Sequence, residues 1–87
     1  MRRIIVERKL EDAPDFEALQ ALEDAVAWCL EQHRVTFVRS YFSNDRRTMV
    51  CEYDAPDAEA VRTVQRTGNL PYESIWAAEV LEWQPES

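Results

Sequence analysis

Three glutamates and one arginine occupy positions that alternate with apolar residues, and residues of these types do acid–base chemistry or bind cations. They are Glu7, Arg39, Glu52 and Glu79. In the strand order expected below, they lie in a row across one face of a β-sheet, beside the phenol of Tyr41. An isolated charge is costly to bury, so such residues pair with one another, stay hydrated in a cavity, or hold a ligand. We therefore predict a ligand-binding site at Glu7, Arg39, Tyr41, Glu52 and Glu79, with intersubunit salt bridges or a water-filled gap as the alternative.

The only histidine, His33, follows Cys29 by four residues, so both side chains can project from the same side of a helix. Together they offer a transition-metal ion a nitrogen and a sulfur ligand. Two ligands do not complete a metal site, however, and a histidine at a helix C-terminus also suits the helix dipole. The second cysteine, Cys51, alternates with apolar residues. We expect both cysteines to be small, unreactive residues of the core.

Composition excludes several classes of function. The chain has 87 residues and a net charge of −7, which argues against nucleic-acid binding because that affinity comes from clustered Lys and Arg. The single glycine, Gly68, is too few for a phosphate-binding or dinucleotide-binding loop. No stretch reaches the roughly 20 apolar residues of a membrane span, and the N-terminus lacks the apolar core of a signal peptide. We expect a cytoplasmic protein that binds neither nucleic acid nor membrane.

The tetrapeptide Asp-Ala-Pro-Asp occurs twice, at 12–15 and at 54–57, each time between a strand pattern and a helix pattern. Segments 3–9, 35–43, 48–54 and 75–83 are rich in β-branched and aromatic residues, as strands are. Segments 16–33 and 58–67 have the apolar spacing of helices. The proline interrupts each strand, and Asp15 and Asp57 can cap the helices that follow.

The resulting βαββαβ order predicts an α+β, ferredoxin-like fold, with a four-stranded antiparallel sheet and two helices on one face. We expect one domain over residues 1–83 and a frayed tail at 84–87. Alternation places Ile4, Val6, Cys51, Trp76 and Ala78 under the helices. It gives the opposite face the apolar residues Val35, Phe37, Tyr41, Val50, Ile75, Leu81 and Trp83. A patch of this size is more than a monomer normally exposes, so we predict a homodimer, a dimeric α/β barrel closed by two such faces. The alternatives are an edge-to-edge contact between copies and a monomer shielded by its C-terminal tail.

The stretch VRSYFSNDRRTMVCEYDAPDAEAVR (38–62), continued by NLPYESI (69–75), resembles a family of small bacterial proteins called domain of unknown function 4242. The likeness rests on an Arg-Ser-Tyr strand, an acidic hairpin, a Cys-x-Tyr strand, Ala-Pro-Asp-x-Glu-Ala-Val at a helix start, and Leu-Pro before the last strand. The resemblance implies a dimeric ferredoxin-like protein, and a member described as nickel-binding implies a metal-binding role. Many relatives resemble Arg-Glu-His-Ala where this chain has Arg62-Thr63-Val64-Gln65. Because Val64 cannot ligate a metal, any ion must rely on His33, Cys29 or the glutamates, and we take His33 and Glu52 as candidate ligands.

Three functions follow as hypotheses. The first is a dimeric binding protein that holds a divalent metal such as nickel, or a small ligand, in a cavity between the two sheets. The second is a cofactor-independent enzyme, a monooxygenase or isomerase, which requires a roomy pocket with a perturbed glutamate or tyrosine. The third is a purely structural dimer, which is favoured if the glutamates pair only with Arg39 and similar cations.

Overall fold

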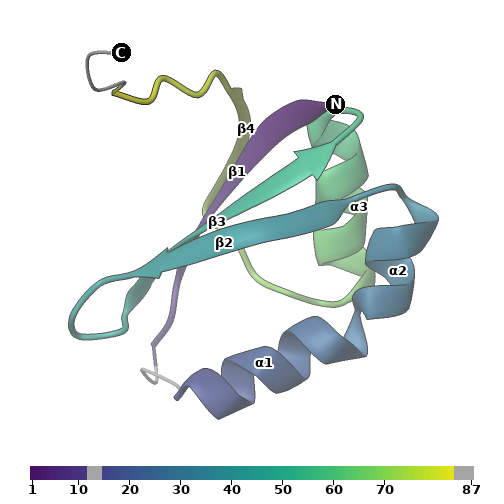
Figure 1. The fold of residues 1–87 in the computed structure, drawn as a ribbon. Helices are drawn as coiled ribbons and strands as arrows, with labels where there is room; N and C mark the ends of the chain where they lie inside the picture. Colours follow the sequence, from purple (N-terminus) through teal and green to yellow (C-terminus); the bar gives the residue numbers. More distant parts are fainter. Residues whose placement is uncertain (12–14, 84–87) are drawn as a thin grey trace.

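The computed structural model describes residues 1–11 and 15–83 (Figure 1). Its elements are β1 (Arg2–Lys9), α1 (Phe16–Ala25), α2 (Ala27–Gln32), β2 (Thr36–Phe42), β3 (Thr48–Ala55), α3 (Ala58–Thr67) and β4 (Ser74–Ala78). The strands form one antiparallel sheet in the order β2-β3-β1-β4. This order confirms the predicted α+β, ferredoxin-like fold. The predicted frayed tail at 84–87 lies outside the described residues.

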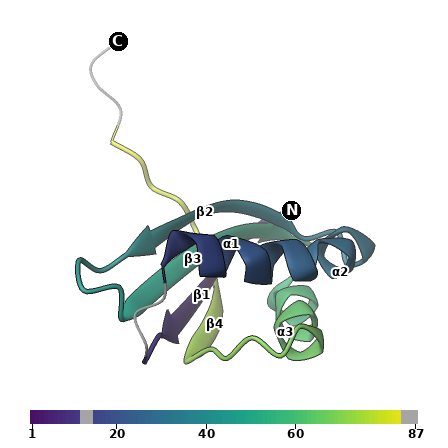
Figure 2. The same cartoon turned by 90° about the horizontal axis from the view of Figure 1, so that it is seen from below.

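The core lies between the sheet and the helices α2 and α3, which contact each other on one face of the sheet (Figures 1 and 2). Ile4 and Val6 of β1 and Val61 and Val64 of α3 are fully buried there. Cys29 and Cys51 are both buried and free, which confirms their predicted place in the core. Each buried aliphatic side chain of this kind stabilises the fold by about 1.5–3 kcal/mol.

Both aspartates that precede a helix cap it as predicted. The carboxylate of Asp57 accepts a hydrogen bond from the backbone N–H of Ala60 at 2.8 Å. Asp15 accepts one from Ala18 at the same distance. Each bond satisfies an N–H that has no partner within its helix. The repeated tetrapeptide therefore marks two equivalent helix starts, although its residues 12–14 lie outside the described part of the chain.

The predicted helix 16–33 is wrong in one respect, because the chain divides it into α1 and α2 at Val26. Val26 is buried, and its side chain lies against Gly68 at the end of α3, so closely that a Cβ on Gly68 would collide with Val26 Cγ1. The division turns α2 onto α3. The only glycine thus permits close packing of two helices, while Asn69, with φ of 55°, takes the left-handed conformation that follows α3.

The last strand differs most from its prediction. β4 ends at Ala78, and residues 79–83 form no strand. Trp76 pairs with Ile5, and Ile75 pairs with Val6, so Trp76 lies on the face away from the helices while Ile75 packs against the core. This is the reverse of the predicted assignment. In the sequence IWAAEVLEW both alternating sets are largely apolar, so alternation alone cannot assign the two faces.

An arginine, Arg8, is only 5% exposed on the helix side of β1. Its guanidinium donates to Gln65 Oε1 at 2.8 Å, to the carbonyl of Pro71 at 2.9 Å and to Cys51 Sγ at 3.8 Å. Among the described residues no carboxylate forms an ion pair with it. Gln65 is fully buried, and its Nε2 has no hydrogen-bond partner among the described residues. The cluster therefore has an excess of donors and lacks a counter-charge.

We expect the substitution Gln65→Glu to raise the free energy of unfolding by about 1–2 kcal/mol at neutral pH, because it removes an unpaired donor and gives Arg8 a charged acceptor. Urea unfolding measures this change. Gln65→Met is the matched comparison and should be less stable than the wild type, since Arg8 then loses its acceptor. A Gln65→Glu variant less stable than the wild type contradicts this account of the cluster.

Candidate functional site

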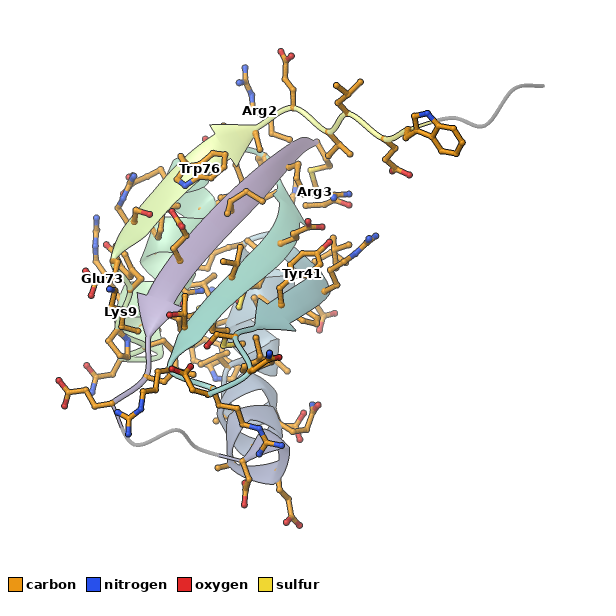
Figure 3. All side chains as sticks on the ribbon, turned by 90° about the vertical axis from the view of Figure 1, so that its left-hand side faces the viewer. Arg2, Arg3, Lys9, Tyr41, Glu73 and Trp76 are labelled. Atoms are coloured by element: carbon orange, nitrogen blue, oxygen red, sulfur yellow. The ribbon has the colours of Figure 1, made fainter. Side chains whose placement is uncertain are left out.

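The face of the sheet away from the helices carries most of the predicted site residues, and we call it the open face (Figure 3). The strand register assigns to it Arg3, Ile5, Glu7 and Lys9 of β1, Thr36, Arg39 and Tyr41 of β2, Thr48, Val50, Glu52 and Asp54 of β3, and Ser74, Trp76 and Ala78 of β4. Tyr41 and Trp76 are about half exposed, at 52% and 47%. The open face therefore combines charged groups with uncovered aromatic rings.

One arginine, Arg3, holds two of the acids on this face. Its NH1 lies 2.9 Å from Glu52 Oε2, and its Nε lies 3.0 Å from Asp54 Oδ1. Arg39 approaches the same Glu52 oxygen from the neighbouring strand, at 3.5 Å. The hydrogen bond to Asp54, with the nearby charge of Glu52, raises the pKa of Arg3 above its usual value. Glu52 is thus engaged by two cations within a single chain.

Glu7 differs from Glu52 because its partners are neutral. Its Oε2 accepts the hydroxyl of Ser74 at 2.8 Å and the indole N–H of Trp76 at 3.1 Å. These two hydrogen bonds, that of Ser74 first, lower the pKa of Glu7 below the usual value of 4.5. Among the described residues no cation forms an ion pair with it. Glu7 is therefore a fixed carboxylate, ionised at neutral pH, that forms no ion pair with the described residues.

The predicted row of four charges does not form. Arg39 and Glu52 are directly paired in the register, but Glu7 lies opposite Val50, two residues from Glu52 along β3. Glu79 lies beyond the end of β4 and is exposed. Its predicted place in the row depended on a strand extending to residue 83. The structure thus brings Glu7, Arg39, Tyr41 and Glu52 onto one face and leaves Glu79 apart.

Two more residues predicted on this face belong to the helix side. Phe37 pairs with Tyr53 in the register, and their rings make an edge-to-face contact at 5.7 Å. Val35 is buried in the core. A bulge between Phe37 and Arg39 explains the difference, because the extra residue shifts the alternation of β2 by one position. The open face is accordingly less apolar than the sequence predicted.

The candidate metal ligands His33 and Glu52 lie on opposite sides of the sheet. His33 follows the last turn of α2 and is partly exposed, whereas Cys29, four residues earlier, is buried. Among the described residues no three His, Cys, Asp or Glu side chains form a group that could hold a metal ion. A single copy of the chain does not bring His33 and Glu52 together, and their roles as ligands stay predictions.

A hollow of about 550 Å³ opens at the end of the sheet where β1 begins. Its lining includes Arg2, Arg3, Asp54 and Glu79. Glu7 and Tyr41, the acid and phenol that a catalytic pocket would use, are not among the lining residues. The hollow gives Glu79 a polar neighbourhood, but it does not join Glu79 to the other residues of the predicted site.

Sequence reasoning missed three residues that organise the open face, namely Arg3, Ser74 and Trp76. Arg3 alternates correctly with Ile5 and Glu7, so the period of β1 was a signal that it shares their face. Ser74 and Trp76 alternate with each other in the same way. Once β4 is aligned with β1, they flank Glu7 and Ile5. Placing Ser74 and Trp76 beside Glu7 and Ile5 requires the register of β4 against β1, which the sequence analysis did not include.

We expect the substitution Ser74→Ala to raise the pKa of Glu7 toward its usual value, and Trp76→Phe to raise it by less, because the hydroxyl makes the larger contribution. Carboxyl NMR titration of each variant measures both changes.

A lowered pKa of Glu7 in the folded state stabilises the fold above pH 4.5, and this stabilisation is lost as pH falls through the pKa of the folded state. The stability lost in Glu7→Gln should therefore be largest at neutral pH and shrink in acid. A Glu7 that titrates normally in the wild type contradicts the geometry.

Comparisons with known proteins place this chain among small proteins of the same fold. The crystal structure of SCO4226 from Streptomyces coelicolor A3(2) superposes with a TM-score of 0.81 at 16% identity, over 92% of this chain and 99% of that one. The P2 domain of the chemotaxis kinase CheA from Thermotoga maritima, solved in complex with the response regulator CheY, gives 0.53 at 16% identity, over 91% and 98%. No curated protein matches, and no helix in the described part of the chain has the length and apolarity of a membrane span.

The family model described as "nickel responsive protein SCO4226-like" matches residues 5–77, which include all of the helices and nearly all of the sheet. The match runs through Glu7, Arg39, Tyr41, Glu52, Ser74 and Trp76 of the open face. The chain therefore belongs to the SCO4226-like family of nickel responsive proteins.

Proposed function

We propose that this protein is a nickel-responsive homodimer, in which two open faces pack together and the two Glu7 carboxylates share one divalent cation. The observation that carries the proposal is the state of Glu7. It is a carboxylate held by Ser74 and Trp76, and it forms no ion pair among the described residues. The description of the family supports nickel as the ion.

A charge balance over the open face supports a divalent ion. Arg3 and Arg39 offset Glu52 and Asp54 within each copy, so those four residues can be covered together without a net charge. Glu7 then remains as an acid that forms no ion pair among the described residues, with the exposed Lys9 two residues along β1 on the same face. Burying it unpaired is expensive. Two copies of Glu7 carry two negative charges, which one divalent cation neutralises.

The number of available ligands also favours a dimer. Within the described residues one copy offers no group of three ligating side chains, whereas a two-fold axis doubles each ligand that lies near it. If the axis runs parallel to the strands and passes midway between β1 and β3, the two Glu7 side chains approach it at the same level from its two sides. Tyr41 and Val50, which share the register row of Glu7, then surround the ion with a phenol and an apolar wall.

Covering the open face also removes apolar surface from water. Tyr41 and Trp76 are half exposed, and Val50 lies between Tyr41 and Glu7. Burying the exposed halves of these side chains on both copies gives about 25 cal/mol for each Å² of apolar area, before the cost of association is subtracted. This face therefore gains more from a partner than an ordinary charged surface does.

A purely structural dimer is the second candidate, and one observation favours it. Within the described part of the chain Glu52 forms ion pairs only with Arg3 and Arg39, as the hypothesis of a structural dimer required. Glu7, in contrast, has neutral hydrogen-bond partners, so the two proposed functions differ in the role that they give to Glu7. If the structural dimer is correct, Glu7 is merely a buried hydrogen-bond acceptor and nickel has no effect on the protein.

Titration calorimetry with nickel chloride at neutral pH tests the metal site. We expect the wild type to bind one ion per two chains. Glu7→Gln should bind at least about 100-fold more weakly, because an amide carries no charge to offset the ion. Glu73→Gln is the matched control, since Glu73 is exposed on the loop before β4, and it should bind like the wild type. A wild type that gives no heat of binding removes the nickel proposal.

The same titration between pH 7 and pH 5 identifies the kind of ligand. With its pKa held below 4.5, Glu7 stays ionised throughout this range, so affinity should be nearly constant. A site built on a histidine would instead weaken as pH falls, because an imidazole that takes up a proton no longer binds a metal ion. Affinity that falls across this range, and that is lost in His33→Gln rather than in Glu7→Gln, would contradict the role given to Glu7.

The dimer is tested separately by sedimentation velocity. We expect Val50→Glu to produce monomers at micromolar concentration, because it places a charge without a partner near the centre of the open face. Ala21→Glu on the exposed side of α1 adds the same charge elsewhere and should leave the dimer intact. A dimer that survives Val50→Glu unchanged would show that another surface holds the copies together.

A further inference from the structure

The five residues after β4 leave the body of the protein with their apolar side chains uncovered, and we call Glu79 to Trp83 the C-terminal arm. Leu81 is 97% exposed and Trp83 is 84% exposed, while Val80 is about half exposed. The arm extends away from the sheet in each view (Figures 1 and 2). Its sequence has the β-branched and aromatic character of a strand, yet it pairs with no strand in the described chain. Such a segment needs a surface that its own chain does not supply.

We propose that the arm is exchanged between two copies, each arm lying beside residues 34–37 of the other copy, at the start of β2. This inference rests on the homodimer proposed above and names a second contact within it. The receiving segment comprises the turn residue Arg34, the buried Val35 and the first two residues of the edge strand, Thr36 and Phe37. β2 is an edge of the sheet, so its outer backbone groups are free to pair with an added strand.

The topology gives the arm the correct position and direction. Ala78 pairs with Arg3, Arg3 with Asp54, and Asp54 with Thr36, so β4 ends at the end of the sheet where β2 begins. Three successive antiparallel pairings make β2 and β4 run in opposite directions. The two-fold axis proposed above, parallel to the strands and midway between β1 and β3, sets β4 of one copy above β2 of the other. The arm then continues antiparallel to the segment that receives it.

The arm is long enough to cross between the sheets and is directed to do so. Packed sheets lie about 10 Å apart, and five extended residues span about 16 Å. The arm leaves the sheet on the side of the open face, away from α2 and α3 (Figure 1). Within its own chain β1 and β3 separate β4 from β2. An arm that folded back would therefore cross the strands instead of pairing along one.

Charge and apolarity are complementary at the two ends of this contact. The arm carries Glu79 and Glu82, both exposed. Arg34 at the receiving turn is exposed, and the side chain of Arg39 on β2 is 58% exposed. Phe37, at 41% exposure, offers an aromatic surface to Leu81 or Trp83. A second copy thus supplies the apolar contact that the arm lacks, together with two further cations for its glutamates.

Disulfide trapping between two differently tagged preparations tests the contact directly. Both carry Cys29→Ala and Cys51→Ala, one adds Leu81→Cys, and the other adds Thr36→Cys. We expect a disulfide-linked dimer that contains both tags. The control replaces Thr36→Cys by Thr67→Cys, at an exposed position of α3, and should stay unlinked.

A second measurement keeps both native cysteines, so that it does not depend on the folding of the trapping variants. In Leu81→Ser combined with Trp83→Ser, the dissociation constant of the dimer from sedimentation equilibrium should rise by about 100-fold. Trp28→Ser, which removes an exposed tryptophan from α2, should not change it. An unchanged constant, or no cross-link to Thr36→Cys, overturns the exchanged arm while the wild type still dimerises. A monomeric wild type overturns the arm and the proposed dimer together.

Discussion

The open face depends on how a single arginine, Arg3, divides its hydrogen bonds. By holding Glu52 and Asp54 at about 3 Å, it turns two acids of one strand into part of a neutral network that Arg39 completes from the other side. Glu7 stands on the same strand as Arg3, four residues along, too far to share it. Glu7 is therefore the acid of the open face that forms no ion pair among the described residues. If Arg3 paired with Glu7, the face would instead expose two acids on β3, and the balance on which a divalent ion depends would change.

Two arginines of β1 show how strand alternation assigns different roles to the same residue type. Arg3 points to the open face and meets carboxylates, while Arg8 points to the helices and meets an amide, a carbonyl and a thiol. The first arrangement neutralises charge and prepares a surface to be covered. The second keeps a charge inside the core with neutral acceptors only, which is a cost that the rest of the core must offset. The position of Gln65 on α3 reduces that cost without removing it.

The sequence was sufficient to predict the fold because several independent signals agreed. Strand and helix patterns, two aspartate caps and a polar hairpin all led to one element order. The site was harder to predict because it depends on register. One bulge in β2 moved Val35 and Phe37 to the helix side, and the early end of β4 moved Glu79 off the sheet and reversed Trp76 with Ile75. Alternation cannot locate a bulge, and it cannot choose a face for a strand that is apolar on both sides.

The early end of β4 also changes what the chain needs from a partner. In the predicted arrangement Leu81 and Trp83 were part of a continuous apolar face, and two such faces would dimerise by hydrophobic contact alone. In the structure these residues stand apart from the sheet, and the face that remains is a neutral ion-pair network around one unbalanced acid. A partner must then satisfy two separate requirements, the charge of Glu7 at the centre and the apolar arm at the edge. A second copy related by one axis along the strands satisfies both at once, because the same rotation that brings Glu7 to Glu7 carries each arm to the start of the opposite β2.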